Sequence, residues 1–333
     1  YYKDKEHYSD GIICDVCKVK LFKQWAKEDS GDGSYIVFQT YPSNLPKSIP
    51  KSIKLSIIIP TRYGIPQQLL DRLSKQSYKP DEIIEVIGSA LTVQRNEGIK
   101  VAMGDIILFL DDDIITNYSY CEKVIEVFNK YSNAMAITGN VITPVYKQNI
   151  LWDIYSRIFL LTHRARGRFQ LSGFPENYHK DINRAIQGEM LYGCNMAFRK
   201  EIFNEFSFCE DLDCRMFGED DYFAWALTQK YKVYYNPSAI CYDNRPYPRS
   251  KQAPKIRHTL INLIKRYHSR NPNFIGKLAF WWAYSGFIIF KIVEAIVMRD
   301  ISIIKGILLC FKKYEDRPLE EIRKEIKIRR INV

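Results

Sequence analysis

Short apolar runs alternate with segments of helical spacing through residues 55–138, and this alternation limits the possible folds more than any other feature of the chain. Each run is followed by Pro, Gly or Asp, which is typical of buried strands. The predicted strands are Leu55–Ile59, Glu82–Ile87, Asp105–Leu110 and Ala134–Thr138, and the predicted helices are Gln67–Gln76, Val93–Ala102 and Tyr120–Tyr131. The alternation predicts an α/β fold with a largely parallel sheet covered by helices on both faces.

The pattern becomes less regular after residue 140 and returns near residue 193. Residues Gly193–Arg199 are predicted to form a strand, followed by a short helix from Lys200. Gly218 opens a helix that runs through Gln229, and a strand over Lys232–Tyr235 is predicted to end at Asn236-Pro237.

Three aspartates, Asp111, Asp112 and Asp113, directly follow the strand predicted at Asp105–Leu110. Ligands of such sheets bind beyond the carboxyl ends of the strands. A divalent cation relieves the repulsion between neighbouring carboxylates, and Mg²⁺ or Mn²⁺ commonly binds one or two carboxylates together with substrate phosphates. Side chains alternate along an extended chain, so Asp111 and Asp113 are expected to point the same way and to share a metal–diphosphate site. A polar turn is the alternative.

A second acidic cluster, Glu219-Asp220-Asp221, lies at the start of a predicted helix. The helix dipole favours acids at this position, so a capped helix is one interpretation. A fixed, ionised carboxylate there also suits a general base. Sugar transfer from a nucleotide diphosphate needs positive charge for the leaving group and a base for the attacking hydroxyl. The two clusters together match those needs.

Five segments, taken in order, resemble the family-2 inverting glycosyltransferases of the GT-A fold. They are Leu55–Thr61, Gln94–Ile99, Gly104–Asp113, Gly193–Lys200 and Gly218–Asp221. The resemblance extends from about Ser56 to Pro237 and implies a GT-A type mixed, mostly parallel sheet flanked by helices.

The resemblance also implies roles for particular residues. Asp220 is expected to be the catalytic base with Glu219 beside it, and Asp111 and Asp113 to face the donor diphosphate and a Mg²⁺ or Mn²⁺ ion. The expected donor-binding residues are Thr61, Arg62, Arg95, Asn96, Asp111, Asp112 and Asp113.

The sequence departs from this family in two places. Many relatives carry an aspartate after the second strand, against the nucleotide base, but Glu85–Ser89 ends without an acid, so the nucleotide is not predicted. Some relatives carry a metal-binding histidine after the last strand. Here Asp243 lies in that region, and it is interpreted either as a metal ligand or as a turn residue.

The charge is concentrated at the carboxyl-terminal end. Residues 251–333 carry 18 Lys and Arg against 7 Asp and Glu, which accounts for the whole net charge of +11. We expect three parts: an extension and linker (1–52), the GT-A domain (53–250) and a basic helical region (251–333). A neutral enzyme body with a basic, aromatic-rich end favours an anionic membrane surface over nucleic acid as a partner.

Two apolar segments lie within the basic region. Leu278–Met298 is broken by Lys291 and Glu294, and Ile301–Phe311 is too short to span a bilayer. These charges favour attachment in the membrane plane over a true span. A soluble helical subdomain or a dimer interface is the alternative.

The eight cysteines show no disulfide framework, and no signal peptide is recognised. A reducing, cytoplasmic location at the inner face of the membrane is therefore expected. Cys14 and Cys17 form a lone Cys-x-x-Cys, which leaves half a zinc ribbon as an alternative to plain thiols.

The predicted function is metal-dependent, inverting transfer of a sugar from a nucleotide-sugar donor to a hydroxyl acceptor, which we expect to be a lipid-linked glycan or a polysaccharide intermediate. A nucleotidyltransferase on a similar sheet is one alternative, although Thr61–Gly64 is a poor match to the Gly-rich basic loop of such enzymes. A degenerate, membrane-attached binding module is the other. No nucleic-acid partner is expected.

Overall fold

The computed structural model describes residues 53–142, 150–162, 166–211, 218–243, 252–269, 272–311 and 318–331, together with the backbone of three amino-terminal strands. These strands, β1 (Ile12–Cys14), β2 (Val19–Lys27) and β3 (Ser34–Tyr41), pair antiparallel in chain order. Cys17 and the predicted linker at 42–52 lie outside the described residues.

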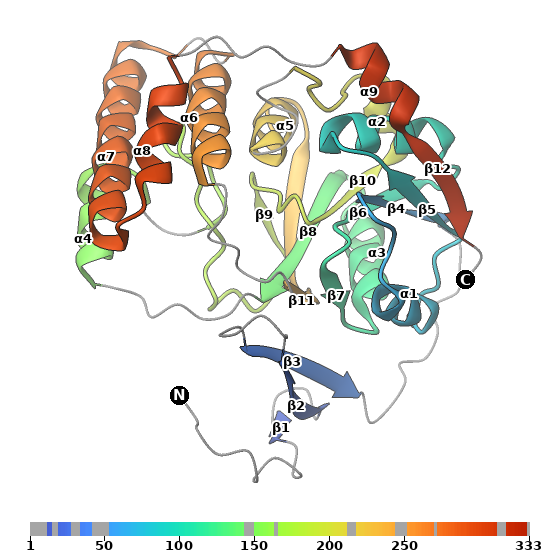
Figure 1. The fold of residues 1–333 in the computed structure, drawn as a ribbon. Helices are drawn as coiled ribbons and strands as arrows, with labels where there is room; N and C mark the ends of the chain where they lie inside the picture. Colours follow the sequence, from blue (N-terminus) through green and yellow to red (C-terminus); the bar gives the residue numbers. More distant parts are fainter. Residues whose placement is uncertain are drawn as a thin grey trace.

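The main sheet of the described chain has the order β12-β5-β4-β6-β10-β8-β11-β7, with β9 paired to β11 (Figure 1). Its strands are β4 (Leu55–Thr61), β5 (Glu82–Ile87), β6 (Ile106–Leu110), β7 (Ile114–Thr116), β8 (Ala134–Ile142), β9 (Ile186–Gly188), β10 (Asn195–Arg199), β11 (Lys232–Asp243) and β12 (Lys327–Ile331). Strands β4, β5, β6, β8 and β11 share one direction, whereas β10 runs antiparallel between β6 and β8. The α/β class with a mixed, mostly parallel sheet is confirmed.

Helices cover both faces of this sheet because its central strands are buried on both sides. The helices against the sheet are α1 (Gln67–Ser74), α2 (Leu91–Val101), α3 (Tyr120–Lys130), η1 (Lys200–Asn204) and α5 (Glu219–Leu227). Ile57 and Ile59 of β4 pack into the core under α1 and α3, whereas Ile58 packs toward α2 and α5. Gly98 lets α2 approach β4 closely, since a Cβ there would lie 2.6 Å from Ile58 Cγ2.

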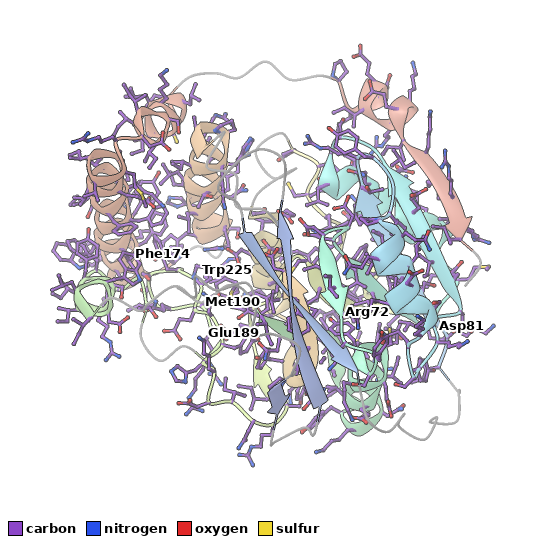
Figure 2. The ribbon with its side chains drawn as sticks, turned by 60° about the horizontal axis from the view of Figure 1, so that its bottom comes forward. Arg72, Asp81, Phe174, Glu189, Met190 and Trp225 are labelled. Carbon is purple, nitrogen blue, oxygen red and sulfur yellow. The ribbon has the colours of Figure 1, made fainter. Side chains whose placement is uncertain are left out.

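A separate helical layer lies beside α5, at the left of Figure 1. It consists of α4 (Ile150–Ile158), α6 (Gln252–Ser269), α7 (Phe274–Met298) and α8 (Ile301–Leu309). This layer has its own core, in which Leu260, Phe280 and Ala283 are almost completely buried. Figure 2 shows Phe174 and Trp225 on the side of the molecule that carries the layer, away from Arg72 and Asp81.

The chain then returns to the sheet. Helix α9 (Leu319–Glu325) packs beside α2, and β12 pairs antiparallel with β5 at the sheet edge. The expected helical region at 251–333 therefore also supplies one strand of the sheet. Lys327–Ile331 is mostly exposed and carries three basic residues, which fits an edge strand.

Strand β11 runs past the predicted stop at Asn236-Pro237 and ends at Asp243, so that prediction is wrong. The register against β8 shifts between Asn236 and Ile240, and this bulge accommodates the proline, which has no N–H to donate. As a result, the end of β11 pairs with β7, and Asp243 lies opposite Ile114.

Candidate active site

The three aspartates lie at the carboxyl end of β6, as the sequence predicts, and all are partly buried. The Asp111 N–H donates to Cys194 O (3.2 Å). Asp112 Oδ2 accepts a hydrogen bond from Thr61 Oγ1 at 2.6 Å. Thr61 ends the neighbouring strand β4, so this hydrogen bond ties two strand ends together.

Arg95 of α2 lies at the centre of the site and is completely buried. Its Nη1 donates to Glu219 Oε1 at 2.8 Å, and its Nη2 donates to Gly193 O at 2.8 Å. Nη2 also lies 3.6 Å from Asp111 Oδ1. One guanidinium group thus joins the strand-end aspartates to the second acidic cluster.

Asp220 is fixed at the first turn of α5. Its Oδ2 accepts from Gly193 N at 2.9 Å, and its Oδ1 accepts from Asp221 N at 2.9 Å. Backbone N–H donors and the helix amino terminus both favour a negative charge here. Gly218 precedes the helix with φ of 77°, a left-handed conformation that suits glycine.

The carboxylates beside Asp220 experience different surroundings. Burial, reinforced by the nearby Asp220 carboxylate and opposed by Arg95, raises the pKa of Glu219 to about 7. Asp221 faces the opposite direction and forms an ion pair with Arg266 Nη1 at 3.1 Å. Burial also raises the pKa of Asp221, against the lowering effect of Arg266.

The strand-end carboxylates fit a hard divalent cation. Asp243 and Asp111 both add to the effect of burial in raising the pKa of the Cys241 thiol, which lies at the same end of the sheet. No group of three His, Cys, Asp or Glu side chains in the described segments would hold a metal by itself. This donor set therefore suits Mg²⁺ or Mn²⁺ bound by one or two carboxylates, with diphosphate and water oxygens completing the coordination.

The expected donor-binding residues fall into two groups. Arg62 is exposed in the loop after β4, where a ligand can reach it. Arg95 and Asn96 make internal contacts instead, since Asn96 Nδ2 donates to Phe208 O (2.9 Å) and Glu210 Oε1 (2.8 Å). Arg95 therefore positions the carboxylates of Asp111 and Glu219 from within the protein, and Asn96 anchors the segment that follows η1.

Two residues were missed as site residues by sequence reasoning, Gly193 and Arg266. From the sequence, Gly193 is expected at the start of a strand without a site role, yet its N–H donates to Asp220, its C=O accepts from Arg95, and a Cβ would lie 2.8 Å from Asp220 Oδ2. Its place directly before β10 was the available signal. Arg266 is one of many basic residues in the carboxyl-terminal region, and nothing in the sequence distinguishes it.

The fold and the joined acidic clusters define an enzyme of the GT-A type. Residues 67–206 match the family model described as glycosyl transferase family 2. The resemblance seen in the sequence is confirmed, and sugar transfer is the class of activity that it supports.

Several solved structures are similar to this chain at low identity. The mannosyltransferase PcManGT from Pyrobaculum calidifontis, solved with GDP-Man and Mn²⁺, is 10% identical (TM-score 0.47; 79% of this chain, 88% of that one). GalNAc-T7, solved with UDP, GalNAc and Mn²⁺, is 12% identical (TM-score 0.47; 66% and 48%). S. aureus TarS is 14% identical (TM-score 0.40; 64% and 39%). These values are too low to carry a ligand over to this chain. No curated protein matches.

Proposed function

We propose that the chain is an inverting glycosyltransferase that moves a sugar from a nucleotide-diphosphate sugar to a hydroxyl acceptor. The observation that carries this proposal is the contact between the two acidic clusters through Arg95 and Gly193. A base and a diphosphate site on the same edge of the sheet are what a single displacement needs.

Asp220 is the proposed base. It takes the proton of the acceptor hydroxyl, whose oxygen attacks the anomeric carbon on the face opposite the departing diphosphate, and this inverts the configuration. The backbone N–H groups of Gly193 and Asp221 hold the carboxylate in place. Asp111 and Asp113 are the proposed holders of Mg²⁺ or Mn²⁺, which when bound supplies positive charge to the leaving diphosphate. Thr61, Arg62 and Asp112 are proposed to border the donor.

The test is Asp220→Asn, assayed with Mn²⁺ and a panel of nucleotide sugars for release of nucleoside diphosphate. We expect turnover to fall by at least about 10²-fold, the lower end of a general base's usual contribution, with donor affinity retained. Glu126→Gln is the control, because this carboxylate pairs with Lys123 on the surface of α3. Full turnover in Asp220→Asn would remove Asp220 from its role.

The same assay separates the two alternatives. A nucleotidyltransferase would release pyrophosphate from a nucleoside triphosphate and a sugar phosphate. A degenerate binding module would bind without releasing either product. The match to a glycosyltransferase family speaks against both.

The proposed location is the inner, cytoplasmic face of a membrane, with the helical layer lying in its surface. Of the helices in the described segments, α7 alone is long and apolar enough to cross a membrane by length and composition. It packs instead along α4 and α8, as in the contact of Phe290 with Trp152. Many outward side chains of these helices are apolar and exposed: Ile150, Leu151, Ile154, Phe274, Ile275, Leu278, Ile296, Val297, Ile301 and Leu308.

Sedimentation with phosphatidylglycerol vesicles tests this attachment. The double variant Ile296→Glu/Val297→Glu places charges on side chains that are 70% and 74% exposed, and we expect it to stay in the supernatant. Met103→Glu is the control, since Met103 is exposed near the start of β6 and outside the helical layer. Equal vesicle binding by all three proteins would contradict the proposed attachment.

A further inference from the structure

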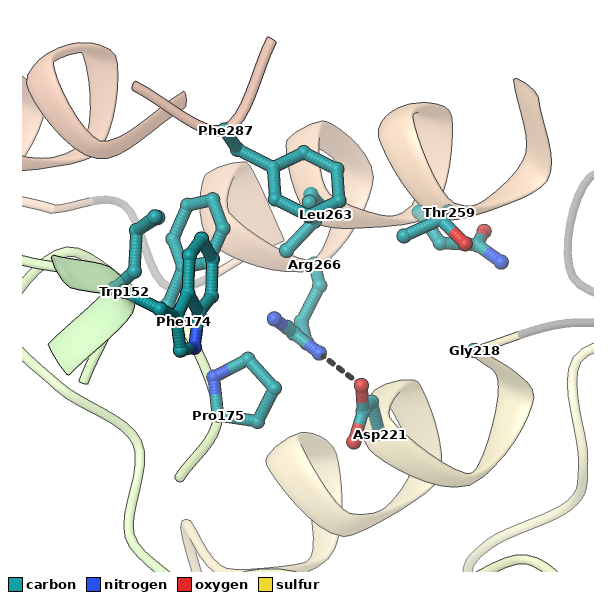
Figure 3. Close-up of a pocket in the computed structure, with 11 residues that line it drawn as sticks. Trp152, Phe174, Pro175, Gly218, Asp221, Thr259, Leu263, Arg266 and Phe287 are labelled. Atoms are coloured by element: carbon teal, nitrogen blue, oxygen red, sulfur yellow. Dashed lines mark ion pairs between the residues drawn. The ribbon is translucent and has the colours of Figure 1, made fainter. Parts of the chain in front are cut away.

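A cavity of about 230 Å³ lies between the helical layer and the first turn of α5 (Figure 3). Most of its wall is apolar and comes from α4, α6, α7, Leu161 and the Phe174-Pro175 pair. The apolar lining residues are Trp152, Leu161, Phe174, Pro175, Leu263 and Phe287. An apolar protein cavity of about 150 Å³ is enough to bind benzene. This cavity therefore has room for a hydrocarbon segment of similar or somewhat larger size.

One cation extends into this apolar space. Arg266 is 2% exposed, and its Nη1 pairs with Asp221 while its Nη2 donates to Gly173 O at 2.8 Å. The guanidinium lies 5.0 Å from the centre of the Phe169 ring. Its Nε is buried and donates to no acceptor within the described residues. A ligand oxygen would give this N–H the partner that buried polar groups ordinarily have.

The cavity adjoins the proposed base. Gly218 and Asp221, both at the start of α5, line it, and Asp220 lies between them in sequence. The Asp220 carboxylate turns toward Gly193, on the donor side of the helix end. A molecule seated in the cavity thus lies against the helix end that carries Asp220.

The cavity also adjoins the exposed apolar face of the helical layer. Trp152 and Phe287 line the cavity from α4 and α7, the same helices whose outer side chains are exposed. Phe290, one turn beyond Phe287, lies against Trp152 with ring centres 4.1 Å apart. Helices α4 and α7 therefore contribute both to the cavity wall and to the exposed apolar face.

We propose that this cavity binds the hydrocarbon segment of an amphiphilic acceptor, with an oxygen at the head of that segment accepting from Arg266 Nε. The acceptor hydroxyl is then presented to Asp220 from the membrane side. The inference rests on the proposed function and specifies its acceptor as lipid-linked.

Calorimetric titration of the full chain with decyl β-D-glucopyranoside, below its micelle concentration, tests the cavity directly. Methyl β-D-glucopyranoside has the same head without the hydrocarbon and is expected not to bind. Leu263→Trp fills the cavity and is expected to weaken decyl glucoside binding at least tenfold. Leu278→Trp is the matched control, because Leu278 is 57% exposed on α7 and does not line the cavity.

Unaltered binding by Leu263→Trp, or equal losses in both variants, would overturn the inference in favour of adsorption on the outer face. Photolabelling of the unaltered chain with a diazirine-tagged decyl glucoside gives a second readout that needs no variant. Labels on Trp152, Phe174 or Phe287 support the cavity, and labels confined to exposed residues of α7 overturn it. If the protein turns over in an Asp220-dependent way but does not bind decyl glucoside in the cavity, only this inference is rejected. If it binds decyl glucoside in the cavity but turns over no nucleotide sugar, the proposed transferase function is rejected.

Discussion

Replacement of Arg95 by Met removes the cation that joins the two acidic clusters while keeping an unbranched side chain in its place. Glu219, only 6% exposed, then loses its charged partner at 2.8 Å. Breaking a buried ion pair from one side typically costs about 3–5 kcal/mol, because the remaining charge stays buried without compensation. The contact of Arg95 with the Phe208 ring, at 5.3 Å, adds about 0.5–2 kcal/mol. We therefore expect Arg95→Met to lower the free energy of unfolding by about 3.5–7 kcal/mol at pH 8.

The stability lost in Arg95→Met should depend on pH. With the pKa of Glu219 at about 7, above its ordinary value of 4.5, the folded chain holds this proton more tightly than the unfolded chain. Stability from this group is therefore present below about pH 4.5 and is lost as the pH rises through 7. Arg95 opposes the upward shift, so without Arg95 the pKa rises further and the loss extends above pH 7. The difference between the wild type and Arg95→Met should be small at pH 5.5 and largest at pH 8.

Urea unfolding followed by circular dichroism at both pH values measures this difference. Arg199→Met is the matched control, because Arg199 donates to the carbonyl groups of Ala134 and Phe128 and forms no ion pair in the described structure. Its cost should not change with pH. The double variant Arg95→Met/Glu219→Leu should recover at least about 2 kcal/mol, since it removes both charges. An Arg95→Met cost that is equal at the two pH values would refute this account of the site.

Three further substitutions test the site. Gly193→Ala places a Cβ 2.8 Å from Asp220 Oδ2, and we expect steady-state assays to show kcat reduced about 10²-fold with the donor KM unchanged; an unchanged kcat would argue against Asp220. Asp113→Asn should weaken Mn²⁺ binding in the presence of nucleoside diphosphate at least tenfold by electron paramagnetic resonance, and equal affinity would exclude Asp113 as a ligand. Thr61→Val loses the 2.6 Å hydrogen bond to Asp112 and should lower stability by about 1–3 kcal/mol in urea unfolding, whereas an unchanged midpoint would show that this bond contributes nothing.

The elements that the sequence predicts well are those whose burial is complete. Strands β4 and β6 are buried along their whole length and β5 along all but its two ends, and the predicted bounds agree with the structure to within two residues. The same pattern predicts the position of the aspartates after β6, because the end of a buried strand fixes where the next residues leave the sheet.

The features that sequence reasoning missed depend on contacts between distant parts of the chain. Strand β12 pairs with β5 although more than two hundred residues separate them, and its pattern alone does not distinguish it from a basic tail. Pro237 marks a strand end on local grounds, but pairing with β8 and β7 extends β11 through a bulge. Arg95 and Arg266 are buried because they contact carboxylates from distant parts of the chain. The spacing of residues along a helix does not predict such contacts.

Strand β12 has a practical consequence for how a lipid-free form of this protein is made. The chain leaves the sheet after β11, builds the helical layer and returns to the far margin of the same sheet, where Arg329 lies near Glu85. Glu85 in turn accepts from Ile65 N in the loop after Thr61. Truncation after residue 250 would therefore remove β12 and leave β5 as an unpaired edge strand, which favours self-association. A detergent-independent preparation is better sought by polar replacements on the outward sides of α7 and α8, with residues 318–331 retained.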